Sequence, residues 1–119
     1  MNRHTRLIGA VVLFLAGGSV AAHPTVMNST PRNGESLVSA PREMRIAFTE
    51  PVEAAYTTFK LVDANSRELG GGQTRSDPAD PKAIFVDLPV LATGVYKAHW
   101  SALGKDGHRV RGELTFSVK

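Results

Sequence analysis

Three residues toward the two ends of the chain carry donor atoms that suit a metal ion. Asp106 and His108 form an Asp-Gly-His triplet near the C-terminus. If the mature chain begins at His23, that residue supplies both an imidazole and an α-amine. One amine, two imidazoles and one carboxylate make a nitrogen-rich ligand set, which is typical of tetragonal Cu(II). The pattern therefore predicts a Cu(II) site made of His23, Asp106 and His108.

The first 22 residues have the pattern of a secretory signal peptide. A basic start with Arg3 and Arg6 precedes an uncharged apolar run over residues 7–16, and small residues follow up to Ala22. This is the order of regions in a signal peptide. The apolar run is shorter than the ~20 residues that a membrane span needs. We predict a cleaved leader over residues 1–22, with an uncleaved signal anchor as the alternative.

The position of cleavage decides whether an α-amine is available to the metal. Cleavage after Ala22 uses Val20 and Ala22 as the recognition residues and frees His23, which is the outcome we predict. Cleavage after Ala21 leaves an additional alanine and removes that amine from the ligand set. Pro24 follows His23 and has no backbone N–H. The next amide therefore cannot join the metal, and the other ligands must come from elsewhere in the fold.

Each candidate ligand also has a simpler interpretation. In extended backbone, residues two apart project to the same side, so Asp106 and His108 can meet at one ion. Asp-Gly is equally a turn signal, and the pair lies between two predicted strands. Glu50 is either a solvated acid or a group that does not bind the metal itself but orients one of the ligands. His99 lies with Lys97 on the polar face of a predicted strand, so we expect a surface histidine.

Composition limits the classes of function. Residues 23–119 have the length of one domain, which can bury a single core. The formal net charge of +3 falls by two when Arg3 and Arg6 leave with the leader, and no basic stripe is present, which argues against nucleic acid as a partner. There is no cysteine, so neither a disulfide nor a thiolate metal site can form. We expect a monomer.

Alternating apolar and polar residues predict an all-β fold. In the last segment, Val110, Leu114, Phe116 and Val118 share one face, and this period of two marks a half-buried strand. Similar alternation predicts strands near residues 44–49, 57–63, 83–88 and 96–102, with an edge strand at 25–29.

Turn residues separate these segments. The polar stretch 65–82 is rich in Gly, Asp and Pro and predicts a long mobile loop or a ragged hairpin. Short strands with turn punctuation favour an antiparallel sandwich or a Greek-key β-barrel.

Several segments occur together in a known pattern. They are His23-Pro24, Ser29-Thr30-Pro31 with Gly34, Phe48-Thr49-Glu50-Pro51, residues 94–100, and Asp106-Gly107-His108 with Gly112 and Phe116. In these residues the chain resembles the CopC family of periplasmic copper-binding proteins over nearly all of residues 23–119. The resemblance implies a small immunoglobulin- or cupredoxin-like Greek-key barrel or sandwich of about seven strands. It also implies His23, Asp106 and His108 as Cu(II) ligands, with Glu50 close to the site.

The same resemblance implies a function in copper resistance or homeostasis. A CopC-like protein would bind one Cu(II) in the periplasm, for sequestration or delivery, without catalysis. Its expected partners are the copper ion and a copper-transporting inner-membrane protein or an exported multicopper oxidase. Some family members carry a Met-rich loop for Cu(I), but residues 64–82 contain no Met and no His. We therefore expect a Cu(II) protein.

Two other functions remain open at this point. An N-terminal histidine with a second histidine is also the ligand set of copper oxidases and monooxygenases with a histidine brace. A metal-free immunoglobulin-like interaction module is the third interpretation.

Overall fold

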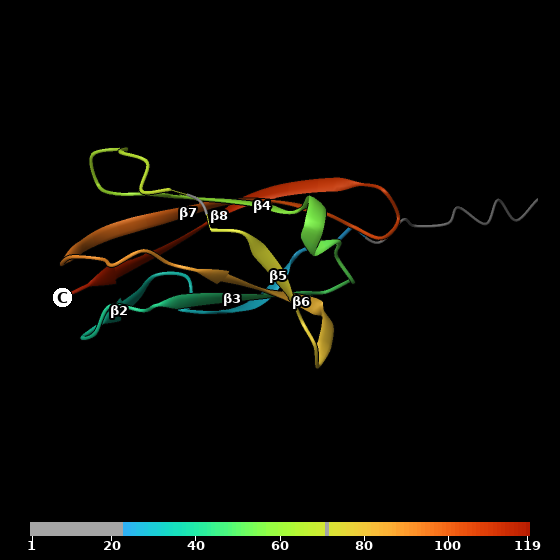
Figure 1. Cartoon of the computed structure of the whole chain (residues 1–119), viewed down its shortest axis with the longest axis horizontal. Coiled ribbons are helices and arrows are strands. Elements are labelled where there is room, and N and C mark those ends of the chain that lie inside the picture. Colours follow the sequence, from blue (N-terminus) through green and yellow to red (C-terminus); the bar gives the residue numbers. More distant parts are fainter. Residues whose placement is uncertain (1–22, 71) are drawn as a thin grey trace, which may run out of the picture.

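Two four-stranded β-sheets face one another in the computed structural model of the protein (Figure 1). The structure describes residues 23–70 and 72–119, so the predicted leader at residues 1–22 lies outside the described residues. No helix in the described ranges is long and apolar enough to cross a membrane. The elements are β1 (Val26–Thr30), β2 (Glu35–Leu37), β3 (Glu43–Phe48), the 3₁₀ helix η1 (Ala54–Tyr56), β4 (Thr58–Val62), β5 (Thr74–Asp77), β6 (Asp80–Asp87), β7 (Gly94–Leu103) and β8 (Arg109–Val118).

The first sheet has the strand order β1-β3-β6-β5, and its neighbouring strands are antiparallel. Met44, Ile46 and Phe48 of the interior strand β3 are at most 1% exposed, which matches the predicted alternation. β1 is an edge strand, as predicted, and it leads the chain from His23 into this sheet.

The second sheet has the order β2-β8-β7-β4 and contains the two longest strands. β7 and β8 form an antiparallel hairpin whose pairing runs from Gly94 opposite Val118 to Leu103 opposite Arg109. Both strands alternate as the sequence predicted, with every second residue buried from Tyr96 onward in β7 and from Leu114 onward in β8. The turn of this hairpin, residues 104–108, contains Asp106 and His108.

The core fills the space between the two sheets. The rings of Phe48 and Trp100 meet edge to face across the sheets, with centroids 5.3 Å apart. Tyr96 and Phe116 stack at 5.6 Å. Burying a side chain of this size stabilises a fold by about 1.5–3 kcal/mol. The apolar faces of the strands therefore supply the stability of this cysteine-free domain.

Part of the stretch 65–82 forms a hairpin. β5 and β6 pair antiparallel around the turn at residues 78–79, which confirms the hairpin alternative for residues 74–82. Asp77 Oδ1 accepts a hydrogen bond from the Ala79 amide at 2.9 Å, and Arg45 of β3 donates to Asp77 Oδ2 across the intervening strand β6. Because these side chains make ion pairs on the outer face, the sequence carries little apolar alternation here.

The fold class is confirmed, with two differences in detail. Of the two predicted architectures the sheets form the sandwich, and the described residues contain eight strands where about seven were expected. One strand that was not predicted is β2, which pairs in parallel with the end of β8. The 3₁₀ helix η1 was also not predicted.

Candidate metal centre

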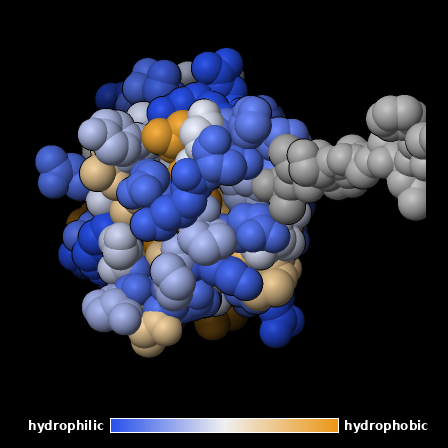
Figure 2. All heavy atoms as spheres, turned by 90° about the vertical axis from the view of Figure 1, so that its right-hand side faces the viewer, coloured by the Kyte–Doolittle hydropathy of each residue, from blue (hydrophilic) through white to orange (hydrophobic). Residues whose placement is uncertain are grey.

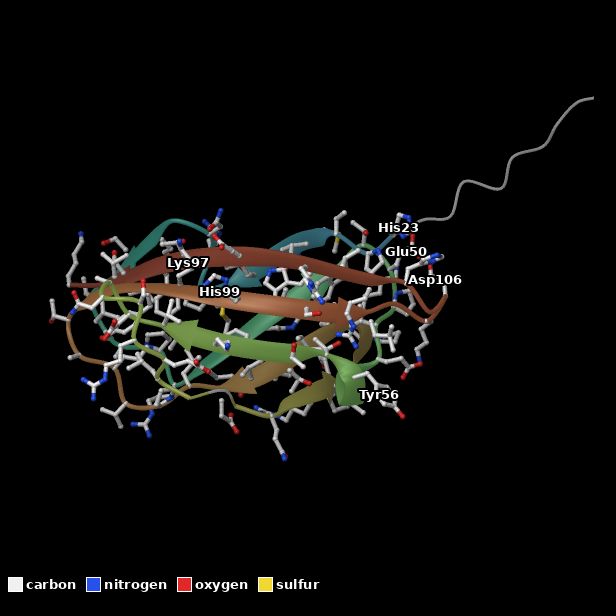
Figure 3. All side chains as sticks on the ribbon, turned by 90° about the horizontal axis from the view of Figure 1, so that it is seen from above. His23, Glu50, Tyr56, Lys97, His99 and Asp106 are labelled. Atoms are coloured by element: carbon white, nitrogen blue, oxygen red, sulfur yellow. The ribbon has the colours of Figure 1, made fainter. Side chains whose placement is uncertain are left out.

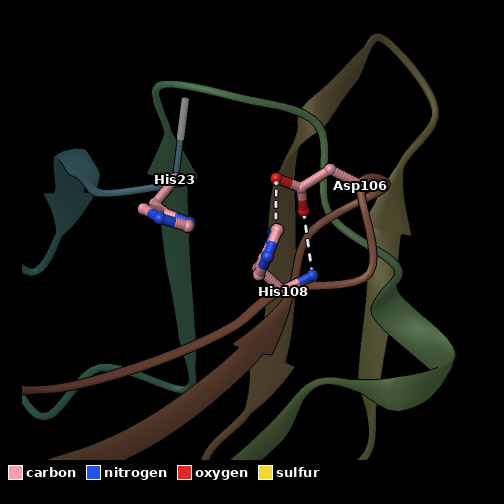
Figure 4. A group of neighbouring side chains, drawn as sticks. All are labelled: His23, Asp106 and His108. Atoms are coloured by element: carbon pink, nitrogen blue, oxygen red, sulfur yellow. Dashed lines mark hydrogen bonds and ion pairs between the residues drawn. The ribbon is translucent and has the colours of Figure 1, made fainter. Parts of the chain in front are cut away.

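His23, Asp106 and His108 lie together at one end of the sandwich (Figure 4). One potential ligand atom from each residue lies within 4.8 Å of those of the other two. The two imidazole rings meet edge to face, with centroids 4.8 Å apart and an interplanar angle of 87°. The structure therefore brings together the three residues that the sequence singled out, although His23 is more than 80 positions from the other two.

His23 is held by the two residues that follow it. Pro24 is fully buried, so it fixes the chain directly behind the histidine. The Thr25 amide donates to Thr49 Oγ1 at 3.1 Å, and the Thr49 amide donates to the Thr25 carbonyl at 2.9 Å. These contacts attach the start of the described chain to the end of β3. The exposed His23 ring is left facing the β7–β8 turn.

Asp106 and His108 are held by the turn of the β7–β8 hairpin. The Gly104 amide donates to the His108 carbonyl at 2.8 Å, and the Gly107 amide donates to the Gly104 carbonyl at 3.0 Å. Gly107 has a φ of +87°, a conformation that suits glycine. The expectation of an extended backbone at Asp106 and His108 was therefore wrong. The Asp-Gly turn signal prevailed because the two long strands must reverse direction here.

The Asp106 carboxylate organises the turn. Its Oδ1 accepts a hydrogen bond from the His108 amide at 3.0 Å, and its Oδ2 lies 3.0 Å from Nδ1 of the same histidine. The backbone hydrogen bond from His108 is the main reason why the pKa of Asp106 is lowered; the His108 side chain lowers it further, and His23 contributes least. Asp106 is thus an anion at neutral pH, oriented beside two imidazoles.

This donor set fits a borderline divalent ion. Neutral imidazoles favour Cu(II), Zn(II) and Ni(II), and affinity among the divalent metals is highest for Cu(II). All three side chains are exposed, so an ion can reach them from solvent. Figure 2 looks onto this end of the molecule, and the face it shows is mainly hydrophilic. That surface suits a hydrated ion better than an apolar ligand.

Glu50 lies at the same end of the molecule as His23 and Asp106 (Figure 3). Its chain neighbours contact both sides of the centre: Thr49 bonds Thr25, and the Pro51 carbonyl accepts from the Lys105 amide at 3.3 Å. The half-buried Glu50 is not in the three-residue cluster. Its place between the His23 segment and the β7–β8 turn is compatible with the predicted supporting role.

His99 lies apart from this cluster. It is on the outer face of β7, opposite Glu113 of β8, with its Nδ1 3.3 Å from Glu113 Oε1. Lys97, on the same face, is 3.7 Å from the same carboxylate. The position agrees with the prediction of a surface histidine.

Sequence reasoning missed the residues that support the ligands. The burial of Pro24, the bonds between Thr25 and Thr49, and the packing around Gly104 all depend on contacts between distant parts of the chain. Only the Pro24 ring offered a signal, because its fixed φ stiffens the residue next to His23.

Comparison with known proteins identifies the family. The family model of the CopC domain matches residues 26–119. The chain belongs to the CopC family. It is 34% identical to copper resistance protein C of Xanthomonas campestris pv. juglandis, over 92% of this chain and 90% of that protein. It is also 31% identical to the copper transport protein CutJ of Bacillus subtilis, over 98% of this chain, but it spans only 22% of CutJ.

Solved structures of the CopC family share the fold. The crystal structure of CopC from Methylosinus trichosporium OB3b has a TM-score of 0.77 at 25% identity, covering 82% of this chain and 94% of that one. The structure of PcoC, a methionine-rich copper resistance protein from Escherichia coli, has a TM-score of 0.68 at 28% identity, covering 82% and 100%. This chain contains three methionines, and of the two described, Met44 is in the core and Met27 is on the edge strand β1.

Proposed function

We propose that this CopC-family chain is a periplasmic Cu(II)-binding protein that contributes to copper resistance or homeostasis. The observation that carries the proposal is the gathering of His23, Asp106 and His108 within 4.8 Å at an exposed end of the sandwich. Membership of a family whose relatives are named for copper resistance and transport supports copper as the ion. The nitrogen-rich donor set favours the Cu(II) state.

The proposed ligands are both imidazoles, the Asp106 carboxylate and the α-amine of His23. The amine becomes available when the leader is removed after Ala22, because the nitrogen of His23 is an amide until then. The imidazoles bind copper in their neutral form, and the carboxylate neutralises part of the ion's charge. Glu50 is assigned the role of orienting the ligands, because it lies between the His23 segment and the β7–β8 turn.

The ligand set favours storage or transfer of the ion over catalysis. Four donors from the chain fill the plane of a tetragonal Cu(II) ion, which leaves little room for a substrate. Delivery would be to a copper-transporting inner-membrane protein or an exported multicopper oxidase. If the protein were instead a histidine-brace enzyme, the copper-loaded form would produce peroxide in the presence of a reductant and oxygen. If it were a metal-free interaction module, the purified protein would hold no copper.

Copper titration of two versions of the protein tests the ligand set. One version begins at His23, and the control carries the additional Ala22, so that both imidazoles remain while the amine moves. We expect one Cu(II) per chain in the first, with a nitrogen-dominated tetragonal electron paramagnetic spectrum. The control should bind more weakly and give a different spectrum. Equal affinity and identical spectra would remove the amine from the ligand set.

The exported protein itself tests the leader. Intact mass of the protein recovered from the periplasm should correspond to residues 23–119, because Val20 and Ala22 satisfy the recognition pattern for cleavage. A protein that stays in the membrane fraction with its first 22 residues attached would support the signal anchor instead.

A further inference from the structure

Gly104 lies where the β7–β8 turn, which carries Asp106 and His108, meets the segment that begins with His23. It is buried at the end of β7 and forms an isolated bridge with Val52. Its amide and carbonyl hold the turn through His108 and Gly107, as described above. Pro24 and the Asp106 carboxylate both lie close to it, near the position that a Cβ would occupy.

Space, and not backbone conformation, is what favours glycine at this position. The φ of Gly104 lies outside the positive range in which glycine is favoured, so its backbone accepts an L side chain. A Cβ built on Gly104, however, would lie 2.7 Å from Asp106 Oδ1 and 3.3 Å from Pro24 Cδ. Cβ contacts below 3.0 Å essentially never occur, so the carboxylate would have to move.

The displaced oxygen is the one that organises the turn. Asp106 Oδ1 accepts the hydrogen bond from the His108 amide, so moving it also releases the backbone of the second candidate ligand. Pressure on Pro24 acts on the residue that anchors His23. One methyl group would thus disturb all three side chains that the site brings together.

We infer that Gly104 is a positioning residue for copper: its missing side chain lets the Asp106 carboxylate and the Pro24 ring approach closely enough to gather the ligands. The inference rests on the proposed Cu(II) site and identifies a determinant of its geometry. The specific cause is the contact with Asp106 Oδ1, which makes the effect separable from a general loss of stability.

Gly104→Ala tests the inference, with Gly72→Ala as the matched control. A Cβ at Gly72 would also clash, at 2.4 Å from the Asp87 carbonyl, but this contact is at the C-terminal end of β6 and not among the site residues. Copper affinity, measured by competition with a Cu(II) chelator, should fall at least about tenfold in Gly104→Ala, as for other residues that orient ligands. The electron paramagnetic spectrum should change as well. Gly72→Ala should lower the melting temperature and keep wild-type affinity.

A double-mutant cycle with Asp106→Ala identifies the route of the effect. If Gly104 acts through the carboxylate, adding Gly104→Ala to Asp106→Ala should cost clearly less affinity than it costs alone, because residues in contact are not additive. Additive losses, or unchanged affinity in Gly104→Ala beside a wild type that binds copper, would overturn the inference. A wild type that binds no copper would instead refute the proposed function.

Measurements on the metal-free protein keep the test decisive if Gly104→Ala is unstable. Removing the Asp106 side chain relieves the clash, so the double variant should melt at a higher temperature than Gly104→Ala alone. The His108 amide should exchange faster with solvent in Gly104→Ala than in the wild type, because its acceptor has moved. A double variant that melts lower than Gly104→Ala, or unchanged exchange at His108 in a folded variant, would contradict the proposal.

Discussion

At the scale of single residues, two histidines with different neighbours are expected to differ in function. His108 faces His23 across 4.8 Å and has an anionic carboxylate beside it. His99 is paired with Glu113 on the outer face of the second sheet. The residue type is the same, and the surroundings distinguish a ligand from a surface side chain.

Replacing His108 should damage copper binding much more than replacing His99. His108→Ala removes a nitrogen ligand and should weaken Cu(II) affinity by more than about 100-fold, beyond the loss typical of residues that only support ligands. His99→Ala should stay close to wild type. Chelator competition on both variants checks the difference. A greater loss in His99→Ala would mean that the ligand assignment is wrong.

The ligand residues could be predicted from the sequence, but their supports could not. His23, Asp106 and His108 are recognisable because few residue types bind metals and because the spacing is distinctive. Gly104 is one of eleven glycines in the chain. Nothing in its immediate sequence indicates that Pro24, 80 positions earlier, packs against it.

At the scale of elements, the β7–β8 hairpin connects the core to the site. Trp100 and Gly112 are directly opposite each other in this hairpin. A Cβ on Gly112 would lie 2.4 Å from Cζ2 of the Trp100 ring. The indole therefore covers the glycine, an arrangement in which an aromatic residue compensates for a glycine within a strand.

Gly112→Ala should destabilise the metal-free domain. The methyl group would displace the Trp100 ring, and overpacking of this kind costs about 1–3 kcal/mol. Urea unfolding followed by Trp100 fluorescence measures the change in free energy of unfolding. Arg111→Ala, at the exposed neighbouring position, is the control and should change stability by less than ~0.5 kcal/mol. Equal unfolding midpoints for Gly112→Ala and the control would contradict this account.

The strands that could be predicted from the sequence are those in which apolar and polar residues alternate regularly. β7 and β8 are ten residues long, with regular inward and outward positions, and both were predicted. β2 has three residues and depends on pairing with a strand about 80 positions away, so local sequence carries no sign of it. β5 has few apolar residues because its side chains serve ion pairs instead of the core, as Arg75 does with Glu43 and Asp87.

At the scale of the whole molecule, the core and the candidate site are separate in space. The core residues lie between the sheets, whereas the three ligands are exposed at one end. Loss of the ion should therefore leave the sandwich intact.

Acidification should release copper before the domain unfolds. Protons compete with the ion for the imidazoles and the amine, because these groups bind copper only in their neutral form. The lowered pKa of Asp106 means that this carboxylate keeps its charge to more acidic pH than an ordinary aspartate. Affinity should thus fall as pH decreases, with uptake of more than one proton. A pH titration that records the copper spectrum and Trp100 emission together checks the order. Simultaneous loss of copper and fold would indicate a structural metal.

Cu(I) should bind weakly. Soft Cu(I) prefers thiolate and thioether ligands. The chain has no cysteine, and among the described residues its methionines are one buried core residue and one residue on an edge strand. Competition with a Cu(I) chelator under reducing conditions measures the affinity. Retention of Cu(I) against the chelator would reveal soft ligands that this ligand set lacks.

The ligands come from opposite layers of the sandwich, and this has a mechanical consequence. His23 leads into β1 of the first sheet, whereas Asp106 and His108 belong to the hairpin of the second. An ion bound by all three would link the two sheets, and on the side of the first sheet this link runs through the edge strand β1. Amide exchange in β1 should slow on copper loading, while exchange in β5, at the other edge of the same sheet, should not.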